Sequence, residues 1–156
     1  MRRPAQVALL ALLALPASLL GGCGDNQQPT AARELYGRIQ EEDYRSWRRA
    51  PGYETRRQTN APHAESVDIY VNEVVAAALD AGQPLDAWPA GSLIVKDGFD
   101  DDDELELVAV MEKRDDGWFW AEYFGGDDAK FSGKPEVCLD CHDSGDDFVR
   151  AFPLPR

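Results

Sequence analysis

Four segments in the middle of the chain alternate between hydrophobic and polar residues, which is the pattern of β-strands with one buried face. In the first, Ser66–Asn72, the apolar residues Val67, Ile69 and Val71 share one face. The others are Gly91–Asp97, Glu104–Lys113 and Gly117–Phe124. The last two are joined by the turn sequence RDDG, so we predict a β-hairpin there.

Two further segments have the pattern of helices. The first runs from Thr30, which can cap a helix, to about Trp47. The second, Asn72–Gly82, begins with a capping asparagine and ends at a glycine. We expect loops at 48–63 and 125–137, and a short final helix or strand in GDDFVRAF. The pattern therefore predicts a β-rich chain with a few helices.

The N-terminus has the features of an export signal. Arg2 and Arg3 precede an apolar run that Pro16 interrupts and that is too short to span a membrane comfortably. The segment ends in LGGC, which resembles the lipobox of bacterial lipoproteins, so we predict lipidation of Cys23. The alternative is ordinary signal cleavage nearby, which would leave Cys23 as a free thiol.

This interpretation divides the chain into a lipoprotein-type signal peptide at 1–22, a polar tether at 23–29 and one domain at 30–156. We expect a periplasm-facing protein anchored in a bacterial membrane. The residue after the lipidated cysteine is Gly24. Lipoproteins that are retained at the inner membrane typically have Asp at this position, so by resemblance we expect the anchor to lie in the outer membrane.

The charge of the chain limits its partners. It has 16 Lys and Arg residues against 29 Asp and Glu residues, for a net charge of −13. Nucleic-acid binding needs clustered basic residues, so we expect no nucleic-acid partner. Hydrophobic residues make up 44% of the chain, which is enough for a packed core and argues against disorder.

The most specific chemical motif is CLDCH near the C-terminus. The pattern C-x-x-C-H is typical of c-type haem attachment, in which two thiols bond to the haem vinyl groups and the adjoining histidine ligates iron. We therefore predict one covalently attached haem c, with Cys138 and Cys141 as thioethers and His142 as the proximal iron ligand. Export agrees with this, because haem is attached to such motifs after export.

Other chemistries of these residues are weaker. An oxidising compartment favours a disulfide, and Cys138 and Cys141 are close enough in sequence to form one. A structural zinc site needs four ligands, and His63 is the one other good candidate apart from carboxylates. A redox C-x-x-C motif usually belongs to a thioredoxin-like βαβ unit, which the pattern does not show.

The place of the motif restricts the class of cytochrome. Small electron-transfer cytochromes usually carry it near the N-terminus with a methionine ligand downstream, whereas no Met or His follows His142. Cytochromes c′ carry it near the C-terminus, but on a four-helix bundle. The strands predicted above exclude such a bundle and leave a β-rich haem protein.

In order along the chain, the segments IYVN, PAGSLIVKD, VAVMEK, GWFWAEYF and CLDCH resemble the cytochrome P460 family, which includes the β-type cytochromes c′. The resemblance covers about Ser66 to Phe152. It implies an α+β fold, a mostly antiparallel β-sheet with a few packed helices and one C-terminal c-type haem. It also implies a homodimer and a five-coordinate iron with an open distal side.

The resemblance implies two activities. Members called P460 oxidise hydroxylamine and carry an extra bond from a lysine amine to a haem meso carbon, and Lys96 matches that lysine. Members called cytochrome c′-β lack this bond and bind nitric oxide or carbon monoxide. From the strand pattern alone, Lys96 could instead be a strand-end lysine whose ammonium group reaches water.

Two departures from the family bear on the enzymatic activity. Val67 stands where hydroxylamine oxidisers tend to have arginine, and the loop that carries their distal carboxylate is very short here. No carboxylate can therefore be assigned by resemblance. We expect the nearby acids Glu104, Glu106 and Glu122 to be solvent-facing strand residues.

Three functions remain open: an enzyme acting on hydroxylamine or a related small nitrogen oxide, a gas-binding protein, and a six-coordinate electron carrier. The third would need His63 or Met111 as second axial ligand, whereas we expect His63 at the surface and Met111 in the core. We expect as partners a small nitrogen-oxide ligand, a redox protein and a membrane reached through the lipid.

Overall fold

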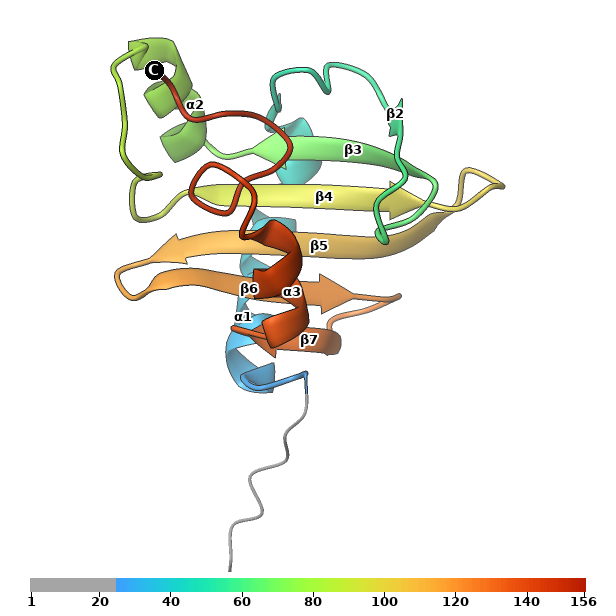
Figure 1. Ribbon diagram of the computed structural model, residues 1–156. Coiled ribbons are helices and arrows are strands. Elements are labelled where there is room, and N and C mark those ends of the chain that lie inside the picture. The colour runs from blue at the N-terminus through green and yellow to red at the C-terminus, as the bar shows by residue number, and fades with distance from the viewer. Residues whose placement is uncertain (1–24) are drawn as a thin grey trace, which may run out of the picture.

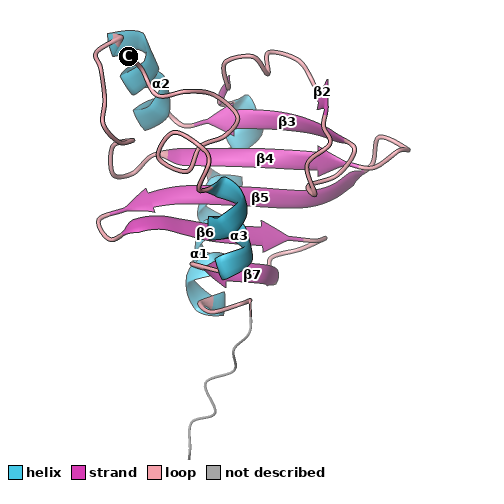
Figure 2. Cartoon of the chain, viewed as in Figure 1, coloured by secondary structure: helices cyan, strands magenta, loops and turns pink. Residues whose placement is uncertain are grey.

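The structure is a computed structural model and describes residues 25–156, so the predicted signal peptide and Cys23 lie outside the described residues. The described chain forms one antiparallel sheet of seven strands with helices on its two faces (Figures 1 and 2). The elements are α1 (Pro29–Glu41), η1 (Tyr44–Ser46), β1 (Arg48–Arg49), β2 (Arg57–Gln58), β3 (Ser66–Val71), α2 (Glu73–Ala81), β4 (Leu93–Phe99), β5 (Leu105–Arg114), β6 (Gly117–Tyr123), β7 (Ala129–Gly133) and α3 (Glu136–His142).

The strands follow the order β1-β3-β4-β5-β6-β7, and β2 also pairs with β3. The α+β fold with a mostly antiparallel sheet is therefore confirmed. Each named strand pair is antiparallel, and consecutive long strands are neighbours. The connection from β3 to β4 runs through α2, whereas the later connections are short. Among residues 25–156, no helix is both long and apolar enough to cross a membrane.

The sheet has a hydrophobic cluster on each face. On one face, α1 buries Leu35 and Ile39 against strand residues such as Val95 and Tyr123. On the other face, α3 and the C-terminal segment cover a second cluster, to which Ile94 and several other strand residues contribute. Because both faces are covered, β3 is buried at every position, including those predicted to be polar-facing.

The four predicted long strands are confirmed, with boundaries shifted by one or two residues. The second helix is confirmed together with its caps: the Asn72 side chain accepts a hydrogen bond from the Val75 N–H at 3.3 Å, and Gly82 adopts φ 57°. Glycine reaches that left-handed conformation without steric cost, so it ends the helix.

Four expectations need correction. The expected 48–63 loop contains the two-residue strands β1 and β2, because both pair with β3. The first helix starts at Pro29 after the N-cap Gln28, and it ends at Glu41, so Thr30 is not its cap. Beyond it, Asp43 adopts the left-handed φ of 48° and redirects the chain into η1. Part of the expected 125–137 loop is the strand β7, because it pairs with β6. The segment GDDFVRAF forms turns and one isolated bridge rather than a regular element.

Residues 25–28, which we expected within the polar tether, lie along β7. The Gln27 N–H donates to the Ser132 carbonyl at 2.9 Å, and the Ser132 N–H donates to the Asp25 carbonyl at 2.9 Å. The described chain therefore begins at the β7 end of the sheet (Figure 1).

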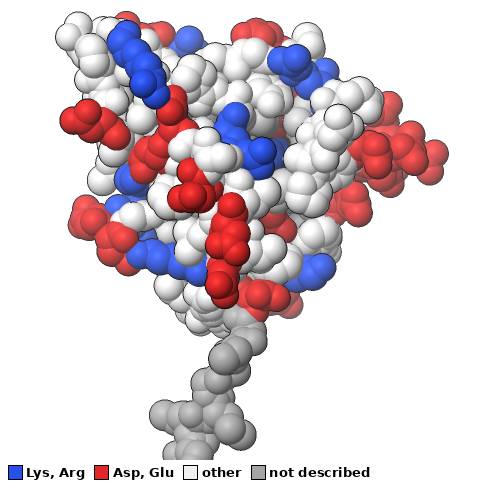
Figure 3. Space-filling view, viewed as in Figure 1, with Lys and Arg blue, Asp and Glu red and all other residues white. Residues whose placement is uncertain are grey.

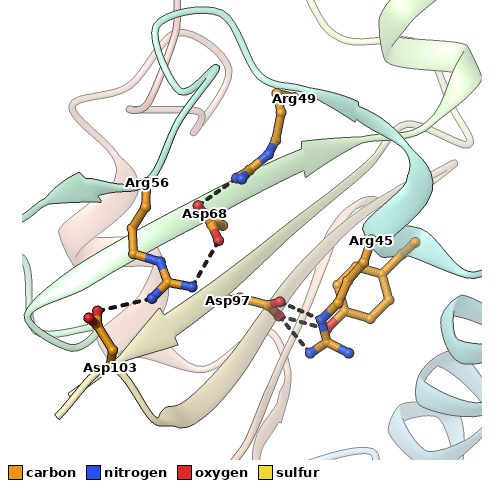
Figure 4. Close-up of polar contacts among 7 residues, drawn as sticks. Arg45, Arg49, Arg56, Asp68, Asp97 and Asp103 are labelled. Atoms are coloured by element: carbon orange, nitrogen blue, oxygen red, sulfur yellow. Dashed lines mark hydrogen bonds and ion pairs between the residues drawn. The ribbon is translucent and has the colours of Figure 1, made fainter.

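Buried aspartates bind arginines along β3 and β4 (Figure 4). Asp97, 1% exposed, accepts hydrogen bonds from the Tyr44 hydroxyl at 2.6 Å and from Arg45 Nε at 2.7 Å. Asp68 forms ion pairs with Arg49 at 2.6 Å and Arg56 at 3.3 Å. These contacts attach the 44–56 segment to the sheet, on the side of β4 away from the Lys96 side chain.

Candidate functional site

A cavity of about 810 Å³ lies between the sheet and α3. Its volume is within the range of small-molecule and cofactor sites. Apolar side chains make up much of its wall, among them Val67, Ile69, Ile94, Ala109, Met111 and Trp120. The polar residues predicted as candidates for chemistry also line it, namely His63, Lys96, Cys138, Cys141 and His142. The structure thus brings the C-terminal motif and the β4 lysine to one cavity.

The helix α3 presents the C-x-x-C-H motif to this cavity. Its cysteines are three residues apart and His142 follows Cys138 by four, so all three lie on one helical face. Both thiols are free, so the alternative of a disulfide between Cys138 and Cys141 is not what the structure contains. Burial raises the pKa of the Cys138 thiol to about 12.

His142 is held in the form that suits a metal ligand. Its Nδ1 lies 2.8 Å from the Phe148 carbonyl oxygen, which can only accept, so Nδ1 carries the proton and Nε2 keeps its lone pair. Burial lowers the pKa of His142 to about 4, so the imidazole is neutral near pH 7. Histidines that ligate a metal through one ring nitrogen usually donate such a hydrogen bond from the other ring nitrogen.

The turn after α3 is built to offer that carbonyl. Asp147 and Phe148 both adopt left-handed backbone angles, with φ of 46° and 66°. The Asp147 carboxylate accepts hydrogen bonds from Lys113 Nζ at 2.7 Å and from the backbone N–H of Trp88 at 2.8 Å. The backbone carbonyl of Asp147 accepts a third from the Trp118 indole N–H at 2.8 Å. Such backbone angles cost free energy and persist where surrounding contacts fix them. These contacts therefore position His142 through the Phe148 carbonyl.

Lys96 and Glu122 face the cavity from neighbouring parts of the sheet. Lys96 pairs across β4 and β5 with Ala109, and Ala109 pairs across β5 and β6 with Glu122. Directly paired residues point to the same face, so the three form one transverse row. Burial lowers the pKa of Lys96, which favours its neutral amine, while nearby Glu122 acts in the opposite direction.

The expectation that Glu122 faces solvent is wrong. Its side chain is 13% exposed and lines the cavity. By contrast, Glu104 and Glu106 are exposed as expected. The signal for Glu122 was present in the RDDG hairpin: pairing Arg114 with Gly117 sets a register that places Glu122 beside Ala109.

His63 is also not a surface residue. Its side chain is 15% exposed, its Nδ1 lies 3.0 Å from Glu122 Oε1, and its ring centroid is 6.3 Å from that of His142. Met111 is 8% exposed and belongs to the core, as expected, although it also lines the cavity. Within residues 25–156, His, Cys, Asp and Glu side chains form no group of three or more arranged to hold a metal ion.

A comparison with protein-family models matches residues 41–149 to the family described as cytochrome P460. The chain belongs to the cytochrome P460 family. The resemblance found in the sequence is thus confirmed over most of the chain. Comparisons with curated proteins and with solved structures give no match. Membership of this cytochrome family implies a haem cofactor.

The residues of the cavity fit such a group. Two unpaired thiols and one neutral imidazole share one helical face, which is the donor set of c-type attachment. The rest of the wall is mainly apolar, as a porphyrin face requires, and the cations Lys130 and Arg150 line the same cavity. When bound, haem would supply an iron atom that can bind a small ligand and exchange electrons.

Proposed function

We propose that this member of the cytochrome P460 family is an exported mono-haem c-type cytochrome acting on hydroxylamine or a related small nitrogen oxide. Cys138 and Cys141 hold the haem as thioethers, and His142 is the proximal ligand. The observation that carries this proposal is the common cavity of the C-x-x-C-H motif, Lys96 and Glu122. A carboxylate and a partly buried amine therefore line the same compartment as the proposed haem-binding residues.

Glu122 is the proposed proton acceptor. Oxidation of hydroxylamine releases protons along with electrons, and an enclosed apolar site needs a base to receive them. A carboxylate of low exposure, in a wall that is mostly apolar, meets this need. The assignment supplies the carboxylate that the sequence comparison could not.

Lys96 is the proposed site of a haem crosslink, in which its nitrogen would replace the hydrogen of a meso carbon while an external oxidant such as peroxide takes up the two electrons released. A lysine must lose its proton before its nitrogen can bond to carbon, and burial lowers the pKa of Lys96 in this direction. Its place in the cavity wall, one strand pair from Glu122, supports contact with the cofactor. Lys96→Met should abolish the crosslink and leave haem attachment to the cysteines intact.

A second function, binding of nitric oxide without turnover, is favoured by the apolar part of the wall. Val67, Ile69, Ile94 and Ala109 form an uncharged surface beside Lys96 that suits a small uncharged ligand. The two functions share the cavity and differ in whether Lys96 is bonded to haem and whether Glu122 takes protons.

Absorption spectra of the haem-loaded mature protein, oxidised and reduced, with and without nitric oxide, test the proposal. A red-shifted reduced band that disappears in Lys96→Met would support the crosslinked hydroxylamine oxidiser. An ordinary high-spin c-type spectrum that changes with nitric oxide would support gas binding. A low-spin spectrum indifferent to ligand would instead indicate an electron carrier with His63 or Met111 on the iron.

We further propose that the protein is lipidated at Cys23, anchored in the outer membrane with its domain facing the periplasm, and homodimeric. Electrons leave to a separate redox protein. Acidic side chains gather along α3 (Figure 3), and the net charge of −13 supports a basic partner that docks there. Mass spectrometry of the Cys23 peptide, sedimentation analysis and salt-dependent binding of a basic cytochrome test these points separately.

A further inference from the structure

Glu122 has one close polar neighbour among the described residues. His63 Nδ1 lies 3.0 Å from its Oε1, and both side chains are largely buried, at 15% and 13% exposure. Lys96 forms no ion pair within residues 25–156, although the charge of Glu122, in the same transverse row, acts to raise the pKa of Lys96. A buried carboxylate needs a compensating partner, and His63 Nδ1, a buried nitrogen with no hydrogen-bond partner of its own in the described chain, is the side-chain atom placed nearest to it.

The loop that carries His63 is built to hold it against the sheet. A side chain at Gly98 would place its Cβ 2.8 Å from the His63 carbonyl oxygen, so only glycine permits this approach. Ala64 adopts φ of 81°, which is unfavourable for a residue with a side chain. The loop closes on itself and on β4, because the Thr59 N–H donates to the Glu65 carbonyl at 2.9 Å and the Glu65 N–H donates to Phe99 at 3.0 Å.

Strain of this kind persists where other contacts over-determine a conformation, and it is typical of functional sites. Here its effect is to place one imidazole in the cavity wall. His63 is separated by 59 positions along the chain from its contact, Glu122, so the pairing depends on the fold rather than on local structure.

We propose that His63 is a positioning residue that holds the Glu122 carboxylate toward the cavity and away from Lys96. Without the imidazole, the carboxylate would turn to the lysine amine in the same row. That ion pair would remove the proton acceptor and keep Lys96 protonated. The inference rests on the proposed function of Glu122.

The test uses the haem-loaded mature protein and four variants: His63→Ala, His63→Asn, Glu122→Gln and the double variant His63→Ala/Glu122→Gln. Two readouts are taken, the N–O stretching frequency of the nitric oxide complex and kcat/KM for hydroxylamine. The frequency reports the charge near a bound ligand, and a merely structural role would not move it. Glu65→Ala, exposed on the same loop, is the matched control.

We expect Glu122→Gln to shift the N–O frequency and lower kcat/KM about 100-fold, within the range for loss of a general base. His63→Ala should shift the frequency in the same direction and lower kcat/KM about tenfold. The double variant should be no worse than Glu122→Gln, because His63 acts through Glu122. His63→Asn, which keeps an N–H donor, should recover part of the loss, and the control should match wild type.

Two results would overturn the inference and leave the proposed function intact. One is a His63→Ala protein with wild-type frequency and kcat/KM while Glu122→Gln is impaired. The other is a double variant whose losses are the product of the single ones. If Glu122→Gln itself changes nothing, the proton-acceptor role fails and the inference with it. A low-spin wild-type spectrum that becomes high-spin in His63→Ala would show His63 on the iron and refute positioning.

Discussion

The turn that fixes His142 depends on one carboxylate, and Asp147→Asn tests its contribution. Asp147 is 12% exposed and binds Lys113, itself 16% exposed, while its backbone lies in a left-handed conformation. Asparagine has nearly the same shape and tolerates that conformation, so the substitution removes the charge without new strain. The predicted effect is therefore that of the lost ion pair alone.

The loss of stability in Asp147→Asn can be worked out from the hydrogen bonds that the asparagine can still accept. The carboxylate now accepts from Lys113 Nζ at 2.7 Å and from the Trp88 N–H at 2.8 Å. The asparagine oxygen can keep one of these, so one charge-assisted hydrogen bond is lost, which is worth about 2 kcal/mol. Asp147→Ala loses both bonds and adds the strain of a left-handed alanine, for about 4 kcal/mol in all.

Urea unfolding of the haem-free chain, followed by circular dichroism, measures these free energies. Asp116→Asn is the control, because its ion pair with Lys134 is exposed and should leave the unfolding midpoint unchanged. The loss in Asp147→Asn should be accompanied by weaker haem incorporation, since the Phe148 carbonyl is no longer fixed. If Asp147→Asn unfolds at the wild-type urea concentration, the turn is not held by this carboxylate and the reasoning fails.

Three further outcomes are expected. The haem-free chain should lose stability as pH falls from 6.5 to about 4, because the unfolded chain then binds a proton that folded His142 does not. This contribution of His142 to the free energy of unfolding amounts to at most about 3 kcal/mol, and solvent screening reduces it further. It should be absent from the pH profile of the His142→Ala variant. Gly98→Ala should destabilise the fold by about 1–3 kcal/mol in urea unfolding, because the new Cβ would lie 2.8 Å from a backbone oxygen. Gly37→Ala is the control: its Cβ would have no atom within 4 Å, so the substitution should be neutral or stabilising. Asp97→Asn should lower the free energy of unfolding by about 3 kcal/mol in the same assay, because Asp97 is 1% exposed and its loss leaves Arg45 and Tyr44 without a charged acceptor. An unchanged unfolding midpoint would contradict this.

Much of the sheet could be predicted because its strands repeat a simple pattern. The β-hairpin of β5 and β6 followed from alternation and a four-residue turn, and α2 from residues that cap both its ends. The strand β7 could not be predicted in this way. It has five residues, and its pairing with β6 depends on the sheet already formed.

The haem motif was recognisable from spacing, whereas its helix was not. The residues of α3 show no apolar stripe, because the face that matters is directed at a cofactor cavity rather than at a core. Local sequence also gave no sign that the loop histidine, His63, would meet Glu122. That contact follows from the glycine at position 98 and from the tertiary packing of the loop.

The polar end of the cavity was partly within reach of the sequence. Lys96 came from the family resemblance, and the register of the β5–β6 hairpin would have placed Glu122 beside Ala109. The general expectation that a strand glutamate faces water was stronger and gave the wrong result. Extending the strand register from the predicted turn would have shown that Glu122 points to the same face of the sheet as Lys96.

Whether haem is attached at the C-x-x-C-H motif is seen directly in the mass of the peptide containing Cys138 and Cys141, taken from the mature protein produced with a c-type maturation system. We expect the wild-type peptide to carry one haem through two thioether bonds, and the Cys138→Ala/Cys141→Ala variant to carry none. His142→Ala should lose the proximal ligand and with it the spectrum of the wild-type iron. A peptide without haem, with both cysteines as thiols or joined as a disulfide, would show that this protein is not a c-type cytochrome.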